Sequence, residues 1–183
     1  MTPAIVSKEL DGPIEIRRLS IAEARERVSA LAAVLVDCVE GGASVSFMWP
    51  FTQRDAEAFF HKVVESVAAG DRMLLAAFAE GKLVGTVQIL TATPPNQPHR
   101  ADIAKLLVLR SERGKGVGSL LMGQVEREAK SAGKTLLVLD TVTGGDAERL
   151  YARLGWVRGC VIPHYALLPN GRFCDTTIFW KEI

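Results

Sequence analysis

A glycine-rich segment in the second half of the chain has the residue types of an anion-binding turn. It reads Arg113-Gly114-Lys115-Gly116-Val117-Gly118-Ser119, between an apolar run at 105–109 and an amphipathic run at 120–129. Glycines at alternate positions let the backbone approach a ligand and adopt positive φ. The N–H groups that open a helix attract anions, and Arg113 and Lys115 add full charges. The segment predicts a phosphate or pyrophosphate site; the alternative is a turn whose glycines serve only packing.

Three further side chains are candidates for proton transfer. Asp140 ends a strongly apolar strand, and strand ends are where α/β folds place reactive groups; its carboxylate could instead bond the next turn. Tyr151 shares a helical face with Leu150 and Leu154, so periodicity allows either a core residue or a phenol that is protonated at neutral pH and can donate. Asp102 lies near the start of its strand, where a solvated or amine-anchoring role is as compatible as catalysis.

The segment 43–51 is rich in aromatic and small polar residues and fits no period. It contains Ser44, Phe47 and Trp49, and it lies between two expected helices. Two interpretations stay open, a hydrophobic plug and the wall of a binding pocket. Of the three histidines, only His164, on a closing strand, is placed near a substrate. No metal-ligand cluster and no Ser/His/Asp arrangement is visible, so no metal is predicted.

Periodicity and capping signals predict one domain, residues 1–183, with a mixed α/β sheet covered by helices. Ser20 with Glu23 has the spacing of a capping box, and the helix that follows is expected to end at Gly41. Strands are predicted at 13–19, 73–79, 83–91, 101–109, 135–142, 156–168 and 172–180, and helices at 20–41, 52–67, 117–131 and 147–154.

Composition limits the classes of partner. The apolar share of 48%, charged share of 23% and net charge of +1 are ordinary for a globular protein, so neither nucleic acid nor membrane is expected as a partner. Residues 1–9 lack the pattern of a secretion signal. Three cysteines are too few and too scattered for a disulfide framework, and reduced thiols in the cytoplasm are expected.

Two motifs together resemble a known superfamily. The segment Arg113-Gly114-Lys115-Gly116-Val117-Gly118 matches the signature Arg/Gln, two residues, Gly, one residue, Gly/Ala of the GNAT N-acetyltransferases. The segment Leu150-Tyr151-Ala152-Arg153-Leu154-Gly155-Trp156 is similar to the superfamily's Leu-Tyr-x-x-x-Gly-Phe. The resemblance implies a central, mostly antiparallel twisted sheet of about seven strands with about four helices.

The resemblance also implies a co-substrate and site roles. Acetyl-CoA would place its pyrophosphate on the glycine-rich segment and its pantetheine arm along the splayed strand 106–109. There, Leu107, Val108 and Leu109 would supply the contacts, with main-chain groups offered by Leu107 and Leu109. Tyr151 would be the acid for the departing thiolate. Many members carry an Asn where this chain has Gly144.

Within the superfamily, the segments 41–45, 100–102, 139–141 and 168–172 resemble those of tabtoxin resistance proteins, which acetylate a β-lactam toxin. This implies an acceptor that is a small, amino-acid-like amine. A β-lactam toxin or an antibiotic would be one example of such an amine. Asp140 and Asp102 would be candidates for the base, and the acceptor would lie near Ser44, Phe47, Trp49 and His164. A homodimer is common among such enzymes. Two alternatives are acetylation of protein N-termini or lysines and a non-enzymatic coenzyme A sensor.

Overall fold

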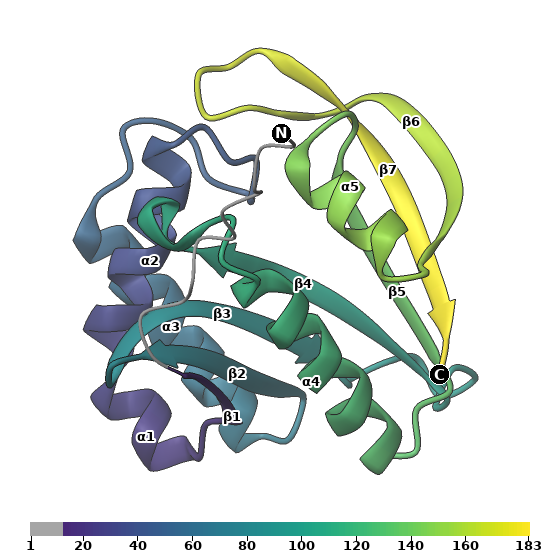
Figure 1. Ribbon diagram of the computed structural model, residues 1–183, viewed down its shortest axis with the longest axis horizontal. Coiled ribbons are helices and arrows are strands. Elements are labelled where there is room, and N and C mark those ends of the chain that lie inside the picture. The colour runs from purple at the N-terminus through teal and green to yellow at the C-terminus, as the bar shows by residue number, and fades with distance from the viewer. Residues whose placement is uncertain (1–12) are drawn as a thin grey trace, which may run out of the picture.

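A seven-stranded mixed sheet forms the middle layer of the protein, with helices on both faces (Figure 1). The computed structural model describes residues 13–183, and the expectation that residues 1–9 hold no secretion signal lies outside them. The described elements are β1 (Ile14–Arg18), α1 (Ile21–Glu26), α2 (Val28–Glu40), α3 (Gln53–Ala68), β2 (Arg72–Ala79), β3 (Lys82–Leu90), β4 (Arg100–Val108), the 3-10 turn η1 (Arg110–Glu112), α4 (Val117–Ser131), β5 (Leu136–Val142), α5 (Asp146–Arg153), β6 (Val157–Leu167) and β7 (Phe173–Glu182).

The strands lie in the order β1-β2-β3-β4-β5-β7-β6. Within the described residues, β4 and β5 are the only parallel neighbours, and every other pair is antiparallel. The predicted fold class, a mostly antiparallel mixed sheet covered by helices, is confirmed. The tight turn between β2 and β3 has positive φ at Glu80 and Gly81, which is the geometry of a two-residue hairpin.

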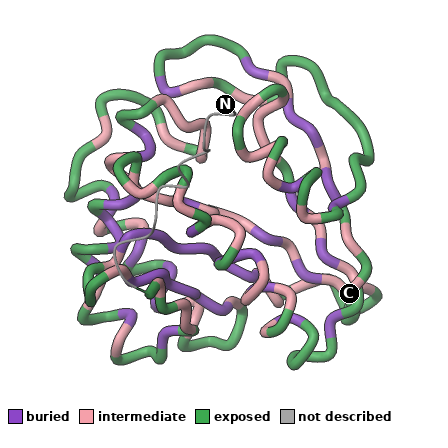
Figure 2. The backbone as a smooth tube through the Cα atoms, viewed as in Figure 1, coloured by how far each residue is buried: buried purple, intermediate pink, exposed green. Residues whose placement is uncertain are grey.

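Two hydrophobic clusters, one on each face of the sheet, hold the layers together, and Figure 2 shows buried residues along the strands between the helices. Alternate residues of a strand point to opposite faces, so β2 and β4 place buried residues in both clusters. One cluster packs α4 and α5 onto the sheet, and the other packs α1, α2 and α3 onto its opposite face. The candidate site described below lies where two neighbouring strands of the sheet, β4 and β5, separate from each other.

Two local expectations differ from the structure. The helix expected from Ser20 to Gly41 is divided at Arg27, where φ −104° and ψ 9° leave the helical range; the guanidinium of Arg27 lies 5.0 Å from the centre of the Phe78 ring. The described residues therefore form five α-helices. The helix predicted at 147–154 begins one residue earlier, at Asp146, with Gly145 as its N-cap, and the side chain of Asp146 pairs with Arg149.

Candidate active site

Strands β4 and β5 pair over only three residues and then separate. Their parallel register ends with Asp102 opposite Val138. Beyond this point β5 continues to pair with β7 on its other side, up to Val142, whereas β4 stays paired with β3 up to Val108. The divergence leaves one edge of β4 without a neighbouring strand (Figure 1), and this β4–β5 gap is the structural basis of the candidate site.

The open edge of β4 is set by a β-bulge. Lys105 and Leu106 stand opposite the single residue Val87, because the register passes from Ala104–Gln88 to Leu107–Thr86. The N–H of Leu109 donates to the carbonyl of Val84 on β3 at 2.9 Å.

Because backbone groups of alternate residues point to opposite sides of a strand, Leu107 also faces β3, and the groups of Leu106 and Val108 face the gap. We expected Leu107 and Leu109 to offer main-chain groups to the gap, and this expectation is wrong. The bulge shifts the alternation by one residue, so that these two residues face β3. The carbonyl of Val108 accepts from Arg113 Nε at 3.2 Å and from Cys38 Sγ at 3.5 Å.

The glycine-rich turn has the backbone shape of an anion cradle. Gly114 and Gly116 have φ of 77° and 84°, a region that other residues rarely adopt. Gly116 is the N-cap of α4 and no side chain caps that helix. Among the described residues, the N–H groups from Gly114 to Ser119 donate no backbone hydrogen bond. These donors and the helix dipole meet at one place, which suits a pyrophosphate.

The two cations of the turn are directed differently from expectation. The guanidinium of Arg113 turns toward β4 and α2, donating to the Val108 carbonyl and lying 3.6 Å from Cys38 Sγ. The ammonium of Lys115 pairs with the carboxylate of Glu112 at 2.9 Å. An anion bound at this turn would therefore meet mainly backbone N–H groups, and Arg113 holds the turn against β4 and α2. On the same side, Asp37 of α2 accepts from the backbone N and Nε of Arg110 at 2.8 and 2.9 Å.

Asp140 and Asp102 lie on opposite strands of the gap but in different surroundings. Asp140 is exposed on β5, and no hydrogen bond or ion pair to its carboxylate is formed within the described residues. Asp102 accepts from Arg100 at 2.9 Å and belongs to the last paired level, where the strands are still joined. The structure thus leaves Asp140 available at the open part of the gap and holds Asp102 in an ion pair at its closed end.

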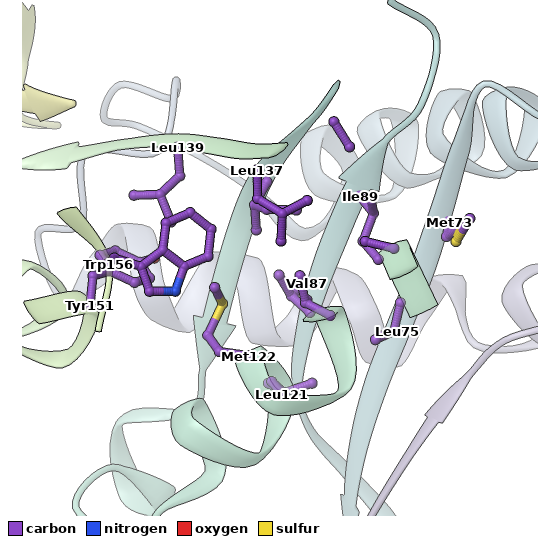
Figure 3. Close-up of a cluster of buried hydrophobic side chains, with 14 of the residues drawn as sticks. Met73, Leu75, Val87, Ile89, Leu121, Met122, Leu137, Leu139, Tyr151 and Trp156 are labelled. Carbon is purple, nitrogen blue, oxygen red and sulfur yellow. The ribbon is translucent and has the colours of Figure 1, made fainter. Parts of the chain in front are cut away.

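Tyr151 projects from α5 into the cluster on the α4 face. Its ring lies 5.9 Å from those of both Trp156 and Phe179, and Figure 3 shows it beside Trp156. The side chain is 5% exposed, and its hydroxyl has no partner among the described residues yet is not one of the fully enclosed polar atoms. Burial, together with the nearby Asp140 carboxylate, raises the pKa of Tyr151 well above its usual range. The phenol therefore keeps its proton throughout the neutral range.

The position of α5 depends on Glu148, which the sequence did not single out. Its carboxylate accepts from the backbone N of Gly144 and from Thr177 Oγ1 at 2.8 Å. The bond from Gly144, then that from Thr177, hold the pKa of Glu148 below its usual range against the opposing effect of desolvation. Gly144 has φ 79°, so the position that carries Asn in many superfamily members here serves a tight turn. Glu148 thereby anchors the first turn of the helix that presents Tyr151.

The α2–α3 loop, residues 41–52, is joined to the end of the β6–β7 hairpin. Ser44 Oγ donates to the carbonyl of Leu167 at 2.8 Å, and the backbone N of Trp49 donates to the carbonyl of Pro169 at 3.0 Å. Phe47 packs on Phe51 and Phe59, as a hydrophobic plug would. Trp49 is 49% exposed and its indole Nε1 donates to the carbonyl of Val39 at 3.0 Å, and its place in the wall of a pocket stays a prediction. His164 on β6 is exposed and has φ 52°. Its backbone N–H donates to Asp175 Oδ1 at 2.9 Å.

Lys105 is the second residue that the sequence pattern left without a role. Its ammonium donates to Ser46 Oγ at 3.1 Å, and the charge of Asp140 acts on it across the gap. The sequence held one signal of a role for Lys105. It is the one charged residue in the otherwise apolar run from Ile103 to Val108.

Comparison with known proteins identifies the class that this fold and site define. Residues 36–156 match the model of the acetyltransferase (GNAT) family. The chain belongs to this family. The alternative of a non-enzymatic sensor is not supported by this match.

Individual relatives cover different parts of the chain. The N-alpha-acetyltransferase MAK3 of Arabidopsis thaliana is 34% identical over 92 residues, which is 50% of this chain and 48% of that protein. The ribosomal-protein-alanine N-acetyltransferase of Brucella melitensis has the same fold with a TM-score of 0.75 and 23% identity, over 92% of this chain and 99% of that one. The Salmonella typhimurium protein yncA, solved with its cofactor acetyl-CoA, has a TM-score of 0.74 and 19% identity, over 92% and 93%.

Three further observations concern residues 13–183. Cys38, Cys160 and Cys174 are free thiols. Within this range no group of three His, Cys, Asp or Glu side chains is arranged to hold a metal ion. Nor is any helix of the range both long and apolar enough to cross a membrane.

Proposed function

We propose that the protein transfers the acetyl group of acetyl-CoA to the amine of a small molecule, by direct attack of the amine in the β4–β5 gap. The observation that carries the proposal is the junction of three features at this gap. The cradle of N–H groups lies at one end of β4, the strand edge beside it is open, and Asp140 lies close enough to Tyr151 to act on its pKa. Acetyl-CoA has a phosphate group, a peptide-like arm and a thioester that match these features in turn.

In this proposal the residues of the chain divide the proton transfers between them. An attacking amine must be neutral, so a base has to accept its proton, directly or through one water. Asp140 is assigned this role because its carboxylate is free of other partners in the described structure. Tyr151 is assigned the opposite role, because a phenol that remains protonated can donate to the departing thiolate. Asp102, paired with Arg100, is assigned to shaping the closed end of the gap.

The acceptor is proposed to lie against the wall formed by the α2–α3 loop and the β6–β7 hairpin. Trp49 offers an exposed aromatic surface on this wall, Phe47 packs on Phe51 and Phe59, and Ser44 fixes the loop to the hairpin. His164 lies on the same hairpin. The resemblance to tabtoxin resistance proteins supports an amino-acid-like acceptor, with a β-lactam toxin or antibiotic as the specific case and the cytoplasm as the expected location.

Acetylation of protein N-termini is a second candidate, favoured by the match to MAK3, whose name is that of an N-alpha-acetyltransferase. Thiol release from acetyl-CoA decides between the two when amino acids, amine antibiotics, a β-lactam toxin and peptides of varied N-terminal residue are compared. We expect release with small amines and mass spectrometry to show one added acetyl group. Thiol release with peptides alone would support protein acetylation instead. If none of the tested amines and peptides caused thiol release, both candidates would be refuted.

Asp140→Asn should lower kcat/KM about 10²-fold, because the isosteric amide cannot accept the proton of the amine. Asp102→Asn is the matched control, since it removes a carboxylate from the neighbouring strand. It should cost under about tenfold in kcat/KM and act mainly through the ion pair with Arg100. Steady-state kinetics with a reactive amine from the panel measures both variants. A larger effect of Asp102→Asn would exchange the two assignments.

We further propose that β6 is the contact of a homodimer. It is the edge strand of the sheet and exposes Val161, Ile162 and Tyr165, and exposed apolar edge strands invite pairing. Sedimentation of the wild type should give twice the chain mass, and Ile162→Lys should give the monomer. A wild-type monomer at all concentrations tested would contradict the proposal.

A further inference from the structure

Lys105 has a backbone conformation that its own side chain disfavours. It lies in the β4 bulge with φ 54°, a region in which residues other than glycine are uncommon. Bulges beside active sites re-aim a side chain away from its regular position in the strand. Here the bulge directs Lys105 out of the apolar alternation of β4 and toward the α2–α3 loop, where its ammonium meets Ser46. Ser46 also has positive φ, 81°.

The ammonium of Lys105 lies across the gap from Asp140. Asp102 and Val138 form the last parallel pair, so Asp140, two residues later, is level with Ala104, the neighbour of Lys105. Burial lowers the pKa of Lys105, and the carboxylate of Asp140 acts in the opposite direction. A cation on β4 and an anion on β5 therefore border the same opening.

Lys105 also lacks the partners that other partly buried lysines of the chain possess. The ammonium of Lys181 contacts Glu126 at 2.7 Å and the carbonyl of Leu154 at 2.8 Å, and that of Lys134 donates to the carbonyl of Pro98 at 2.8 Å. Within the described residues, Lys105 has one neutral hydroxyl at 3.1 Å and no ion pair. A partly buried cation with so few partners is costly unless another group completes its coordination.

We propose that Lys105 binds a carboxylate of the acetyl acceptor, so that the acceptor is an amine that also bears a carboxylate, as a free amino acid or its analogue does. This inference rests on the proposed function, in which the amine reacts in the β4–β5 gap. The carboxylate would meet Lys105 on the β4 side, and the amine would face Asp140 on the β5 side. Opposite charges on the two sides of the gap thus fix the direction in which a zwitterion enters.

Under this inference a protein N-terminus would be a poorer acceptor than a free amino acid. The first residue of a peptide has its carboxyl group in an amide bond, which carries no charge for Lys105 to bind. A site built to bind a charged group discriminates against an analogue that lacks it, because the partly buried ammonium is then left without a counter-charge.

Matched acceptors test this role. Each free amino acid is compared with its amide and with a dipeptide amide of the same first residue, using thiol release by the wild type, Lys105→Gln and Lys105→Arg. The wild type should favour the acid at least about tenfold in kcat/KM. Lys105→Gln should lose this preference mainly through KM for the acid, and Lys105→Arg should retain part of it. Lys62→Gln, at an exposed position on α3, controls for the change in net charge.

Equal use of acids and amides by the wild type, or equal loss on both in Lys105→Gln, would overturn the inference. Absence of thiol release from every amine would refute the proposed function instead, so binding of the same pairs to the coenzyme A complex is measured by calorimetry. Binding that is selective for the acid and lost in Lys105→Gln supports the role of Lys105 even then. Binding of neither compound, or of both alike, overturns it.

Discussion

Tyr151→Phe is expected to lower kcat by about 10²-fold and to leave the affinity for acetyl-CoA unchanged. The phenol has no hydrogen-bond partner in the described structure, so its removal takes away a proton donor without breaking a structural bond. Steady-state kinetics and calorimetric titration with acetyl-CoA measure the two quantities separately. Tyr165→Phe, at the exposed tyrosine of β6, is the control and should match the wild type. An unchanged kcat in Tyr151→Phe would remove the tyrosine from the mechanism.

The same variant tests the burial of the phenol through the pH dependence of stability. An unfolded tyrosine ionises near pH 10, whereas the pKa of Tyr151 in the folded protein is raised. Its contribution to stability is therefore present below pH 10 and is lost as the pH rises above that value. Between pH 9 and 11 the unfolding free energy of the wild type should fall roughly 1 kcal/mol more than that of Tyr151→Phe. Equal losses in denaturant titrations would show that the folded phenol ionises freely.

Gly116→Asp should weaken acetyl-CoA binding by about 10²-fold, the second large effect we expect. A carboxylate at the N-cap of α4 would lie where the backbone donors gather and would repel the pyrophosphate. It would not disturb helix α4 by its charge, because acidic groups near a helix N-terminus are stabilising. The measurement is calorimetric titration with acetyl-CoA, alongside thermal unfolding.

Gly133→Asp provides a matched control at the other end of the same helix. Gly133 has φ 74° against 84° for Gly116, and an added Cβ meets nothing within 4 Å at either position. Both variants therefore introduce the same charge and a comparable backbone strain of about 1–2 kcal/mol. Only Gly116→Asp should lose affinity. A similar loss in Gly133→Asp would mean that strain or charge at any distance is responsible and would refute the cradle.

The mostly antiparallel arrangement of the sheet was implied by the family resemblance. The positions of the strands and helices along the chain followed from the sequence itself, because hydrophobic periodicity and turn residues act locally. The division of the first helix did not, because the apolar spacing continues through Arg27 and only the backbone there departs from helical values. The wrong expectation that Leu107 and Leu109 face the gap has a similar origin. A bulge adds one residue to one strand relative to its partner, and neither strand alone carries a signal of that mismatch.

Side-chain partners contributed by distant segments were also beyond the sequence. Arg113 reads as a phosphate ligand in its motif, yet its guanidinium is bound by groups of α2 and β4. Lys105 reads as one polar residue in an apolar strand, and its position relative to Ser46 and Asp140 depends on three segments that come together only in the fold. By contrast, Tyr151 was assigned to two roles, core packing and proton donation, and its surroundings are compatible with both.

Because β4 and β5 pair over a short ladder, a small change in the angle between the two strands is enlarged at the open end of the gap. Three residue pairs form the pivot, and the arm from Asp102 to Val108 extends roughly 20 Å at the usual rise of a strand. A rotation of about 3° at the pivot therefore moves the far end by about 1 Å, a misplacement that can cost an enzyme about 10²-fold in rate. Packing at Ala101 and Leu137, which are buried at this pivot, thus sets the spacing of groups that neither residue contacts.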